Sequence, residues 1–413
     1  MTVPDPAGSE GAVPSSLMQT YSPAPVTFVR GLGTELWDDR GRRYLDFVAG
    51  LAVVSLGHAH PELADAVAAQ ARRLWHVSNL YRNELAPEVA DTLDRLIGGG
   101  LERAGGQIFF ANSGAEANEC ALKLARRWAG KGRHVVVSAW DSFHGRTLAT
   151  LTATGQPAKH TPFQPLPPGF VHIPYDDLPA LADTLRAARH GGDGGGLAGV
   201  LLEPLQGEGG VIAPSSDYLR GVRQLCDDHD ALLILDEVQT GLGRIGEWFA
   251  FHAQNLEPDV VTMAKALGNG MPVGACWARA EVAAAFGPGD HASTFGGQPL
   301  ALSAAKATLA VMEREDVCGR ARRRGDQLRA ALAGLPLVTE VRGRGLLLAA
   351  QLEGQVATAV ASAALERGLL VNPVRPDAVR LAPPLLVEER EVDEAVSLLS
   401  DALGAVALGR VGA

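Results

Sequence analysis

Three apolar runs of the sequence are each followed by a side chain that can carry acid–base or nucleophilic chemistry; the runs span residues 199–202, 231–235 and 259–263. Glu203 follows the first run, Asp236 follows the second, and Lys265 stands shortly after the third. Acidic residues often end strands and lysines often lie in loops, so each observation alone has a plain structural explanation. Ligands of open α/β sheets bind at the carboxyl ends of the strands. The three observations together therefore predict one crevice that holds an aspartate and a lysine.

An aspartate and a lysine at one edge of a sheet suit the chemistry of pyridoxal 5′-phosphate (PLP). The lysine amine joins the cofactor as a Schiff base, and the carboxylate keeps the pyridine nitrogen protonated, so that the ring accepts electrons. Few side chains compete with Lys265, because only five of the 37 basic residues are lysines. The other four lie in expected helices or in loops with no acidic strand end beside them: Lys123, Lys131, Lys159 and Lys306. We therefore expect Asp236 and Lys265 to be the catalytic pair.

The segment 112–118, Asn-Ser-Gly-Ala-Glu-Ala-Asn, comes directly after another apolar run and opens a helical pattern. Unpaired backbone N–H groups and the helix dipole at such a point favour an anion. This predicts a place for the cofactor phosphate. A plain N-cap by Ser113 followed by a tight glycine turn explains the same residues, and the sequence leaves both interpretations open.

Two other patterns are weaker evidence for a binding site. Residues 241–246, Gly-Leu-Gly-Arg-Ile-Gly, match G-x-G-x-x-G, but five residues separate them from the preceding apolar run and no clear helical start follows. A dinucleotide-binding fingerprint should open a helix directly off the strand. His58 and His60 stand in a turn before Pro61 with no evident carboxylate or cysteine partner, so we expect no metal site.

The elements that must position these residues alternate between helical patterns and short apolar runs from about residue 60 onward. Runs that are apolar at consecutive positions are typical of strands buried on both faces. The alternation predicts an α/β fold with a mostly parallel central sheet. After a long helical pattern near residue 300, further strands and helices follow. We expect an N-terminal segment that packs with the small domain, a large PLP-binding α/β domain and a small C-terminal α+β domain, over residues 1–60, 61–305 and 306–413.

The composition argues against several classes of function. Hydrophobic residues make up 46% and charged residues 20% of the chain, which is a globular and not a disordered profile. The net charge of −10 gives no electrostatic support for nucleic-acid binding. The sequence has no signal-peptide pattern and no run of the roughly 18 apolar residues that would span a membrane. The four cysteines show no CxxC spacing, so we expect neither a zinc site nor disulfides. This pattern predicts a reducing, cytoplasmic location.

From about residue 20 to its end, the sequence resembles the class III aminotransferases of the ornithine and acetylornithine type, which are PLP enzymes of fold type I. The resemblance is specific for the family and less specific for the substrate. Nine segments carry it in order: LDFVAGLAVVSLGHAHP (45–61), NSGAEANECALKLAR (112–126), FHGRTL (143–148), EPLQGEGGV (203–211), LDEVQTGLGRIG (235–246), MAKALGNGMPVGA (263–275), STFGGQPLA (293–301), VRGRGLLL (341–348) and VRLAPPL (379–385).

The resemblance implies how the cofactor is held. Asp236 pairs with the pyridine nitrogen, Gln239 reaches the ring hydroxyl, and Phe143 and Val238 cover the two ring faces. Thr294 reaches the phosphate bound in the neighbouring subunit, which implies a homodimer with shared active sites. The full set of expected cofactor-binding residues is Ser113, Gly114, Ala115, Phe143, Asp236, Val238, Gln239, Lys265 and Thr294.

The resemblance also implies a ping-pong transfer of an amine. Lys265 moves a proton from the substrate carbon to the cofactor, the donor leaves as an aldehyde, and 2-oxoglutarate takes up the amine to become glutamate. Arg146 holds the carboxylate distal to the reacting carbon, and Arg380 holds the α-carboxylate of glutamate. Glu208 pairs with Arg380 while the donor is bound.

The expected donor is N2-acetylornithine, in arginine biosynthesis. Ornithine aminotransferases carry a tyrosine in the stretch matched by residues 49–53, and Leu51 stands there in this sequence, which argues against free ornithine. The FHGR segment with Arg146 is similar to the acetylornithine enzymes. Leu51 and Ser293 are further expected substrate-binding residues. Three departures from the family pattern leave the acyl group open: Val54-Ser55, Ala292 and Gln298.

Other functions stay open at this stage. The donor can be succinylornithine, succinyl-diaminopimelate, ornithine, 4-aminobutyrate or a carrier-bound lysine precursor. The same fold can also serve an aminomutase or a decarboxylase, which would form no glutamate from 2-oxoglutarate. A non-catalytic PLP-binding protein is a third class, and the presence of Lys265, Asp236, Arg146 and Arg380 together speaks against it.

Overall fold

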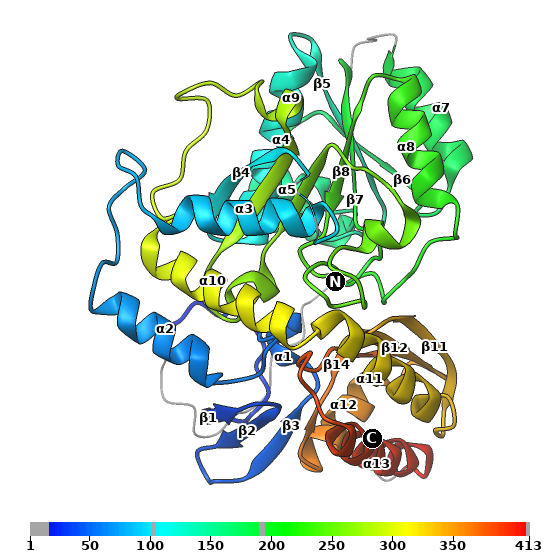
Figure 1. Ribbon diagram of the computed structural model, residues 1–413. Coiled ribbons are helices and arrows are strands. Elements are labelled where there is room, and N and C mark those ends of the chain that lie inside the picture. The colour runs from blue at the N-terminus through cyan, green and yellow to red at the C-terminus, as the bar shows by residue number, and fades with distance from the viewer. Residues whose placement is uncertain (1–15, 101, 103, 190–194, 410–413) are drawn as a thin grey trace.

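The computed structural model describes residues 16–100, 102, 104–189 and 195–409. In this part of the chain the central sheet has seven strands in the order β4-β10-β9-β8-β7-β5-β6 (Figure 1). Neighbouring strands from β6 to β9 pair in parallel, and β10 runs antiparallel to β4 and β9. The predicted mostly parallel sheet is confirmed. The strands are β4 (Gly106–Ala111), β5 (Arg133–Ala139), β6 (Phe170–Ile173), β7 (Gly196–Leu202), β8 (Leu232–Asp236), β9 (Val260–Met263) and β10 (Gly274–Arg279).

Helices cover both faces of this sheet. Along β8, Leu232 and Ile234 belong to one hydrophobic cluster with residues of α4, and Leu233 and Leu235 belong to another with residues of α7 and α8. Burial on both faces is why these strands are apolar at consecutive positions. The helices around the sheet are α3 (Leu85–Ile97), α4 (Gly114–Ala129), α5 (Leu148–Ala153), α6 (Pro157–His160), α7 (Leu178–Arg189), α8 (Tyr218–Asp228) and α9 (Ala280–Ala283), with 3-10 turns η1 (Thr161–Phe163), η2 (Ala250–Gln254) and η3 (Lys265–Gly268).

A smaller α+β region follows at the C-terminus, as predicted. Its sheet has the order β11-β12-β15-β14 and its helices pack on one another (Figure 1). The elements are α11 (Val317–Leu332), β11 (Val338–Arg344), β12 (Leu347–Leu352), α12 (Ala357–Glu366), β13 (Leu369–Leu370), β14 (Asn372–Arg375), β15 (Ala378–Leu381) and α13 (Glu389–Ala407).

The N-terminal strands join this smaller region through β13, which pairs in parallel with β3. A sheet of order β1-β2-β3-β13 results, and Figure 1 shows its blue strands below the main sheet. The long helix α10 crosses residue 305, so the exact domain boundaries stay a prediction. The elements are β1 (Phe28–Leu32), β2 (Glu35–Asp38), β3 (Arg43–Asp46), α1 (Ala49–Ala52), α2 (Pro61–Ala71) and α10 (Pro299–Arg314).

Residues 241–246, which match G-x-G-x-x-G, form turns and do not open a helix. The segment therefore lacks the helix that a dinucleotide fingerprint requires. Among the helices in the described ranges, none combines the length and the apolar character needed to cross a lipid bilayer.

Candidate active site

A cavity of about 380 Å³ lies at the carboxyl ends of β7, β8 and β9. These strands are neighbours in the sheet, and Asp236 stands opposite Thr262 in the register. Glu203, Asp236 and Lys265 all line the cavity, so the three strand-end residues meet in one crevice. The predicted site residues that line it are Ser113, Gly114, Ala115, Phe143, Arg146, Glu208, Asp236, Val238, Gln239 and Lys265.

Lys265 opens η3 directly after β9. Its φ of 38° lies in the left-handed region, which is strained for a residue with a side chain. Burial lowers the pKa of the Lys265 amine; Glu208 opposes this shift and Arg380 adds to it. A lower pKa increases the neutral fraction of the amine, and the neutral amine is the form that acts as a nucleophile or base.

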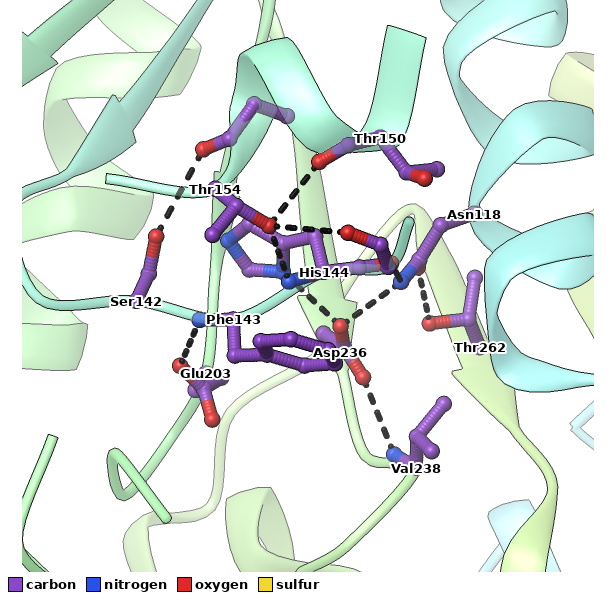
Figure 2. Close-up of polar contacts among 12 residues, drawn as sticks. Asn118, Ser142, Phe143, His144, Thr150, Thr154, Glu203, Asp236, Val238 and Thr262 are labelled. Carbon is purple, nitrogen blue, oxygen red and sulfur yellow. Dashed lines mark hydrogen bonds and ion pairs between the residues drawn. The ribbon is translucent and has the colours of Figure 1, made fainter. Parts of the chain in front are cut away.

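Asp236 is fixed by a buried network of hydrogen bonds (Figure 2). Its Oδ2 accepts from Asn118 Nδ2 at 2.7 Å and from His144 Nδ1 at 2.8 Å, and its Oδ1 accepts from the Val238 amide at 3.1 Å. Thr262 donates to Asn118 Oδ1 at 2.7 Å and thereby orients the amide. The position of the carboxylate is therefore set before any ligand binds.

Sequence analysis did not assign Asn118 or His144 to the site. Both lie inside the quoted segments 112–126 and 143–148, and that position was the available signal. Their shared partner Asp236 is 118 and 92 positions away, so the contacts depend on the fold. His144 Nε2 is buried and has no partner among the described residues. These two side chains are the main support of Asp236.

Glu203 holds the loop that carries Phe143. One carboxylate oxygen accepts from the Phe143 amide at 3.0 Å (Figure 2). The other accepts from the Gly207 amide at 3.1 Å. Burial raises the pKa of Glu203 to about 7, and the charge of Asp236 acts in the same direction. The strand-end carboxylate that the sequence singled out is thus a fixed support for an aromatic ring at the wall of the cavity.

The N-terminus of α4 also lines the cavity. Ser113 Oγ accepts from the Glu116 amide at 3.2 Å, so Ser113 is an N-cap as one of the two interpretations expected. The first two amides of the helix, those of Gly114 and Ala115, have no partner inside the helix and remain available to an anion. A Cβ added at Gly114 would stand 2.8 Å from Val238 Cγ1, so a side chain there would collide with the cavity wall.

These residues fit PLP. Asp236 supplies a fixed carboxylate, and the end of α4 supplies donors for a phosphate. Gln239 lines the cavity with its Nε2 buried and without a partner in the described part of the chain, while its Oε1 accepts from Arg380 at 3.2 Å. An unpaired buried donor is costly unless a ligand group accepts from it. The ring hydroxyl of PLP is such a group, as the sequence comparison with the family implied.

Arg380 forms an ion pair at the substrate side. Its guanidinium is 2% exposed, and its Nη2 lies 2.7 Å from Glu208 Oε1 and 2.8 Å from Asn372 Oδ1. Burial raises the pKa of Glu208, but Arg380 and Lys265 outweigh this and hold the pKa below its ordinary value. Glu208 is therefore charged, and Arg380 reaches the cavity through Glu208 and Gln239. The role of this pair as a switch stays a prediction.

Four predicted site residues do not line the cavity: Arg380, described above, and Leu51, Ser293 and Thr294. Leu51 lies in a left-handed turn over residues 49–52 and is 41% exposed, so Val53 lines the cavity in its place. Thr294 is exposed on this single chain. Ser293 Oγ accepts from Asn112 Nδ2 at 3.2 Å and so lies beside the end of α4. Their substrate- and phosphate-binding roles stay predictions.

The wall that carries Val53 depends on a buried arginine from the Gly-rich turns. Arg244 donates to Ser55 Oγ at 3.0 Å and to the carbonyls of Leu346 at 3.2 Å and Pro383 at 2.5 Å. Burial lowers the pKa of Arg244 to about 9. Ser55 in turn donates to the Ala52 carbonyl at 3.3 Å. The guanidinium thus joins the left-handed turn to the C-terminal region.

The match to known proteins is consistent with this site. The model of the family described as "Aminotransferase class-III" matches residues 17–403. The chain belongs to the class III aminotransferases. This class III aminotransferase is therefore a PLP-dependent enzyme that acts on amino-acid and keto-acid substrates.

The similarity to curated relatives and to solved structures covers nearly the whole length of the aminotransferase. It is 46% identical over 387 residues to the "Acetylornithine aminotransferase" of Methanothermobacter thermautotrophicus, covering 93% of this chain and 95% of the relative. The protein of that name from Gloeobacter violaceus is 48% identical, with 93% and 94% covered. The ornithine aminotransferase of Toxoplasma gondii has a TM-score of 0.88 at 34% identity, with 95% and 94% covered. The N-acetylornithine aminotransferase of Stenotrophomonas maltophilia has a TM-score of 0.80 at 36% identity, with 94% and 98% covered.

Proposed function

We propose that this aminotransferase moves the terminal amine of N2-acetylornithine to 2-oxoglutarate, giving N-acetylglutamate 5-semialdehyde and glutamate, a step of arginine biosynthesis. The ion pair of Glu208 with buried Arg380, beside Lys265, carries the proposal. A donor that reacts at its terminal amine has no carboxylate at the reacting carbon, so Arg380 alone would be a buried charge without a partner. Glu208 supplies that partner while the donor is bound. The α-carboxylate of glutamate replaces Glu208 in the other half-reaction.

The relatives support an N-acylated donor. The curated relatives named acetylornithine aminotransferase are 46% and 48% identical to this chain, whereas the Toxoplasma ornithine aminotransferase is 34% identical. Leu51 stands where the resemblance places a tyrosine in ornithine enzymes. Both observations favour N2-acetylornithine over free ornithine.

In the proposed mechanism Lys265, Asp236 and Arg146 have separate roles. PLP, when bound, supplies an electron sink for the pair left behind as the substrate carbon loses its proton. Lys265 Nζ would take up that proton and donate it again as the amine is transferred. Asp236, oriented by Asn118 and His144, holds a proton at the pyridine nitrogen. Arg146 orients the substrate by its distal carboxylate.

We infer that the enzyme is a homodimer with shared active sites. Large apolar side chains are exposed in two segments of the chain; they are Trp75, Leu80, Tyr81 and Phe295. Asn79 Nδ2 donates to the carbonyls of Ser293 and Gly296, so the two segments that carry these side chains lie together, next to exposed Thr294. Contiguous exposed apolar surface marks an interaction site. Sedimentation of the holoenzyme should give the mass of two chains, and a single-chain mass would contradict the inference.

A cytoplasmic location belongs to the same proposal. The four cysteines are free and buried in the structure, as suits a reducing compartment. The proposed three-part division at residues 60 and 305 is also retained, and limited proteolysis can test it.

A donor screen tests the proposed function. The kcat/KM values of N2-acetylornithine, N2-succinylornithine, ornithine, succinyl-diaminopimelate and 4-aminobutyrate should be compared, each with 2-oxoglutarate as acceptor and glutamate as the measured product. N2-acetylornithine should give the highest value. A higher value for another ω-amine would reassign the donor, and no glutamate from any of them would favour an aminomutase, a decarboxylase or a non-catalytic protein.

A further inference from the structure

Glu208 lies at the tip of a short loop that follows β7. The base of the loop is closed by two backbone hydrogen bonds, because the amides of Gln206 and Ile212 each donate to the other residue's carbonyl at 3.0 Å. Residues 207–211 form the tip, which belongs to no helix or strand. The position of Glu208 therefore depends on the contacts of the tip.

Two arginines of the C-terminal sheet contact the backbone directly after Glu208. Arg375 of β14 donates from Nη1 to the Gly209 carbonyl at 3.1 Å. Arg342 of β11 donates from Nη2 to the Gly210 carbonyl at 3.1 Å. The sheet that supplies the partner of the Glu208 carboxylate thus also holds the two residues that follow Glu208 in the chain.

The pairing of the strands places these arginines on one face of the sheet. Arg342 lies opposite Ala349, and Ala349 lies opposite Arg380. Directly opposite residues in paired strands have their side chains on the same face. Arg375 lies opposite Ala378, which is two positions before Arg380 and therefore on that face as well. Three guanidinium groups of one sheet face thus meet the loop.

The loop carbonyls are the closest partners of the two arginines. Arg342 Nη1 is 3.7 Å from Glu340 Oε2, and Arg375 Nη1 is 3.9 Å from Asp141 Oδ1. Both ion pairs are longer than the bonds to the loop. A hydrogen bond from a charged donor is stronger than one from a neutral donor. The contacts with the carbonyls can therefore hold the loop.

The tip has open space on two sides. Glu208 lines the active-site cavity, whereas Gly209, Arg342 and Arg375 line a second cavity of about 490 Å³. Gly210 has a φ of 115°, and a Cβ there would stand 2.6 Å from Arg375 Cδ, so the arginine packs directly against the backbone. The two arginines therefore restrict the movement of the tip between the two cavities.

We propose that Arg342 and Arg375 are positioning residues that hold Glu208 against Arg380 and so set how readily an incoming carboxylate displaces it. This role rests on the proposed function and deepens it, since it concerns the choice between donor and glutamate at the same site. A donor without a carboxylate at the reacting carbon binds while Glu208 neutralises Arg380. Glutamate binds when its α-carboxylate has replaced Glu208. The two arginines thus favour the donor half-reaction.

The test uses Arg342→Met and Arg375→Met holoenzymes, since methionine keeps much of the apolar chain and removes the donor. Glutarate, a dicarboxylate that undergoes no amine transfer, is the probe, and calorimetry gives its Kd. Because Glu208 should leave Arg380 more readily, each variant should bind glutarate about three- to tenfold more tightly, the effect of one lost hydrogen bond on the competing pair. The kcat/KM for N2-acetylornithine should fall by a similar factor through a higher KM.

Three controls separate this role from general support of the fold. Arg342→Lys keeps a charged donor and should return the Kd toward that of the wild type. Arg126→Met removes an arginine of α4 that donates to the Pro168 carbonyl at 3.1 Å, and should change neither value. In a Glu208→Gln background, Arg342→Met and Arg375→Met should no longer alter glutarate binding, because the competing carboxylate is gone.

Weaker or unchanged glutarate binding in the two methionine variants would overturn the proposal, as would the same tightening in the Glu208→Gln background. If the wild type forms no glutamate from any ω-amine, the proposed function fails. Calorimetry with glutarate does not depend on turnover, so it then still decides whether Arg342 and Arg375 hold Glu208 against Arg380.

Discussion

The two ends of the cavity differ in how firmly their charges are held. At the inner end, Asp236 is buried and its carboxylate is hydrogen-bonded to residues of α4 and of the adjoining loops. At the outer end, Arg146 is exposed and the Glu208 side chain, 31% exposed, pairs with an arginine from the C-terminal region. The inner end needs one arrangement for all substrates, because the chemistry of the amine transfer does not change. The outer end must accept two substrates in turn.

This difference follows from where each group comes from in the chain. The inner residues lie at the ends of adjacent buried strands and a long helix, which fix positions closely. The outer residues lie on loops and on β15. Preorganised charge in a site shielded from water stabilises a reaction, whereas charges that change partners confer selectivity. We therefore expect inner variants to lower kcat and outer variants to alter substrate preference.

The largest expected effect is at the inner end. Asp236→Asn keeps the shape of the side chain but removes the charge that holds a proton at the pyridine nitrogen. We expect kcat to fall by about 10²–10³-fold, as for the loss of other fixed groups that stabilise developing charge. Steady-state kinetics on protein with its cofactor content measured by absorbance will check this. A wild-type kcat in fully loaded protein would show that the inner end does not depend on the charge of Asp236.

The second effect is at the outer end. Glu208→Gln leaves buried Arg380 charged without a carboxylate when the donor is bound. We expect the donor half-reaction to slow by about tenfold to a hundredfold, and the glutamate half-reaction to change much less. Single-turnover absorbance measurements of each half-reaction separate the two. Equal losses in both would contradict the division between the two ends.

A smaller effect concerns the wall behind the outer end. Ser55→Ala removes an acceptor from the buried guanidinium of Arg244, so the free energy of unfolding should fall by about 1–3 kcal/mol. KM for the donor should rise, because Ser55 also holds Ala52, next to Val53 on the cavity wall. The matched control is Ser303→Ala, which removes a buried hydroxyl from α10. Similar changes in both variants would mean that Arg244 does not support the wall specifically.

The smallest effect on activity is expected at Glu237, which follows Asp236 but points away from the cavity, toward Thr240 and the Phe251 amide. Burial raises the pKa of Glu237 from its ordinary value of 4.5 to about 7. Because the folded state has the higher pKa, Glu237 contributes fully to the free energy of unfolding below pH 4.5. That contribution is lost as the pH rises through 7. Between these values the free energy of unfolding should fall by on the order of 1 kcal/mol per pH unit.

Glu237→Gln should remove this slope while kcat stays close to that of the wild type. Urea midpoints of both proteins at a series of pH values between the two pKa values will show it. Parallel curves for the two proteins would mean that Glu237 does not cause the pH dependence.

The sequence predicted the inner end better than the outer end, for physical reasons. Strands buried on both faces are apolar at consecutive positions, so β7, β8 and β9 were found together with the residues that follow them. Strand β10 was missed because Gly274–Arg279 contains glycine, tryptophan and arginine, and its antiparallel direction leaves no local pattern. Asn118 and His144 were missed because their partner is distant in sequence.

At the outer end, local pattern and resemblance alone were less informative. The left-handed turn over residues 49–52 moves Leu51 outward, and nothing in its residue types other than one glycine indicates such a turn. The prediction that Lys159 lies in a loop was wrong, because Lys159 lies in the short helix α6. Its approach to the Phe143 ring exists only after folding. Charges on loops have no periodic pattern, so their meeting is set by tertiary structure.

The central claim is that Lys265 carries the cofactor, and one measurement tests it directly. The holoenzyme is reduced with borohydride, digested, and the peptide that bears the pyridoxyl group is identified by mass spectrometry. We expect the label on Lys265 in the wild type. In Lys265→Ala we expect no labelled peptide and no absorption band of a lysine-bound cofactor. A label on Lys123, Lys131, Lys159 or Lys306 in the wild type, or a reducible adduct in the variant, would contradict it.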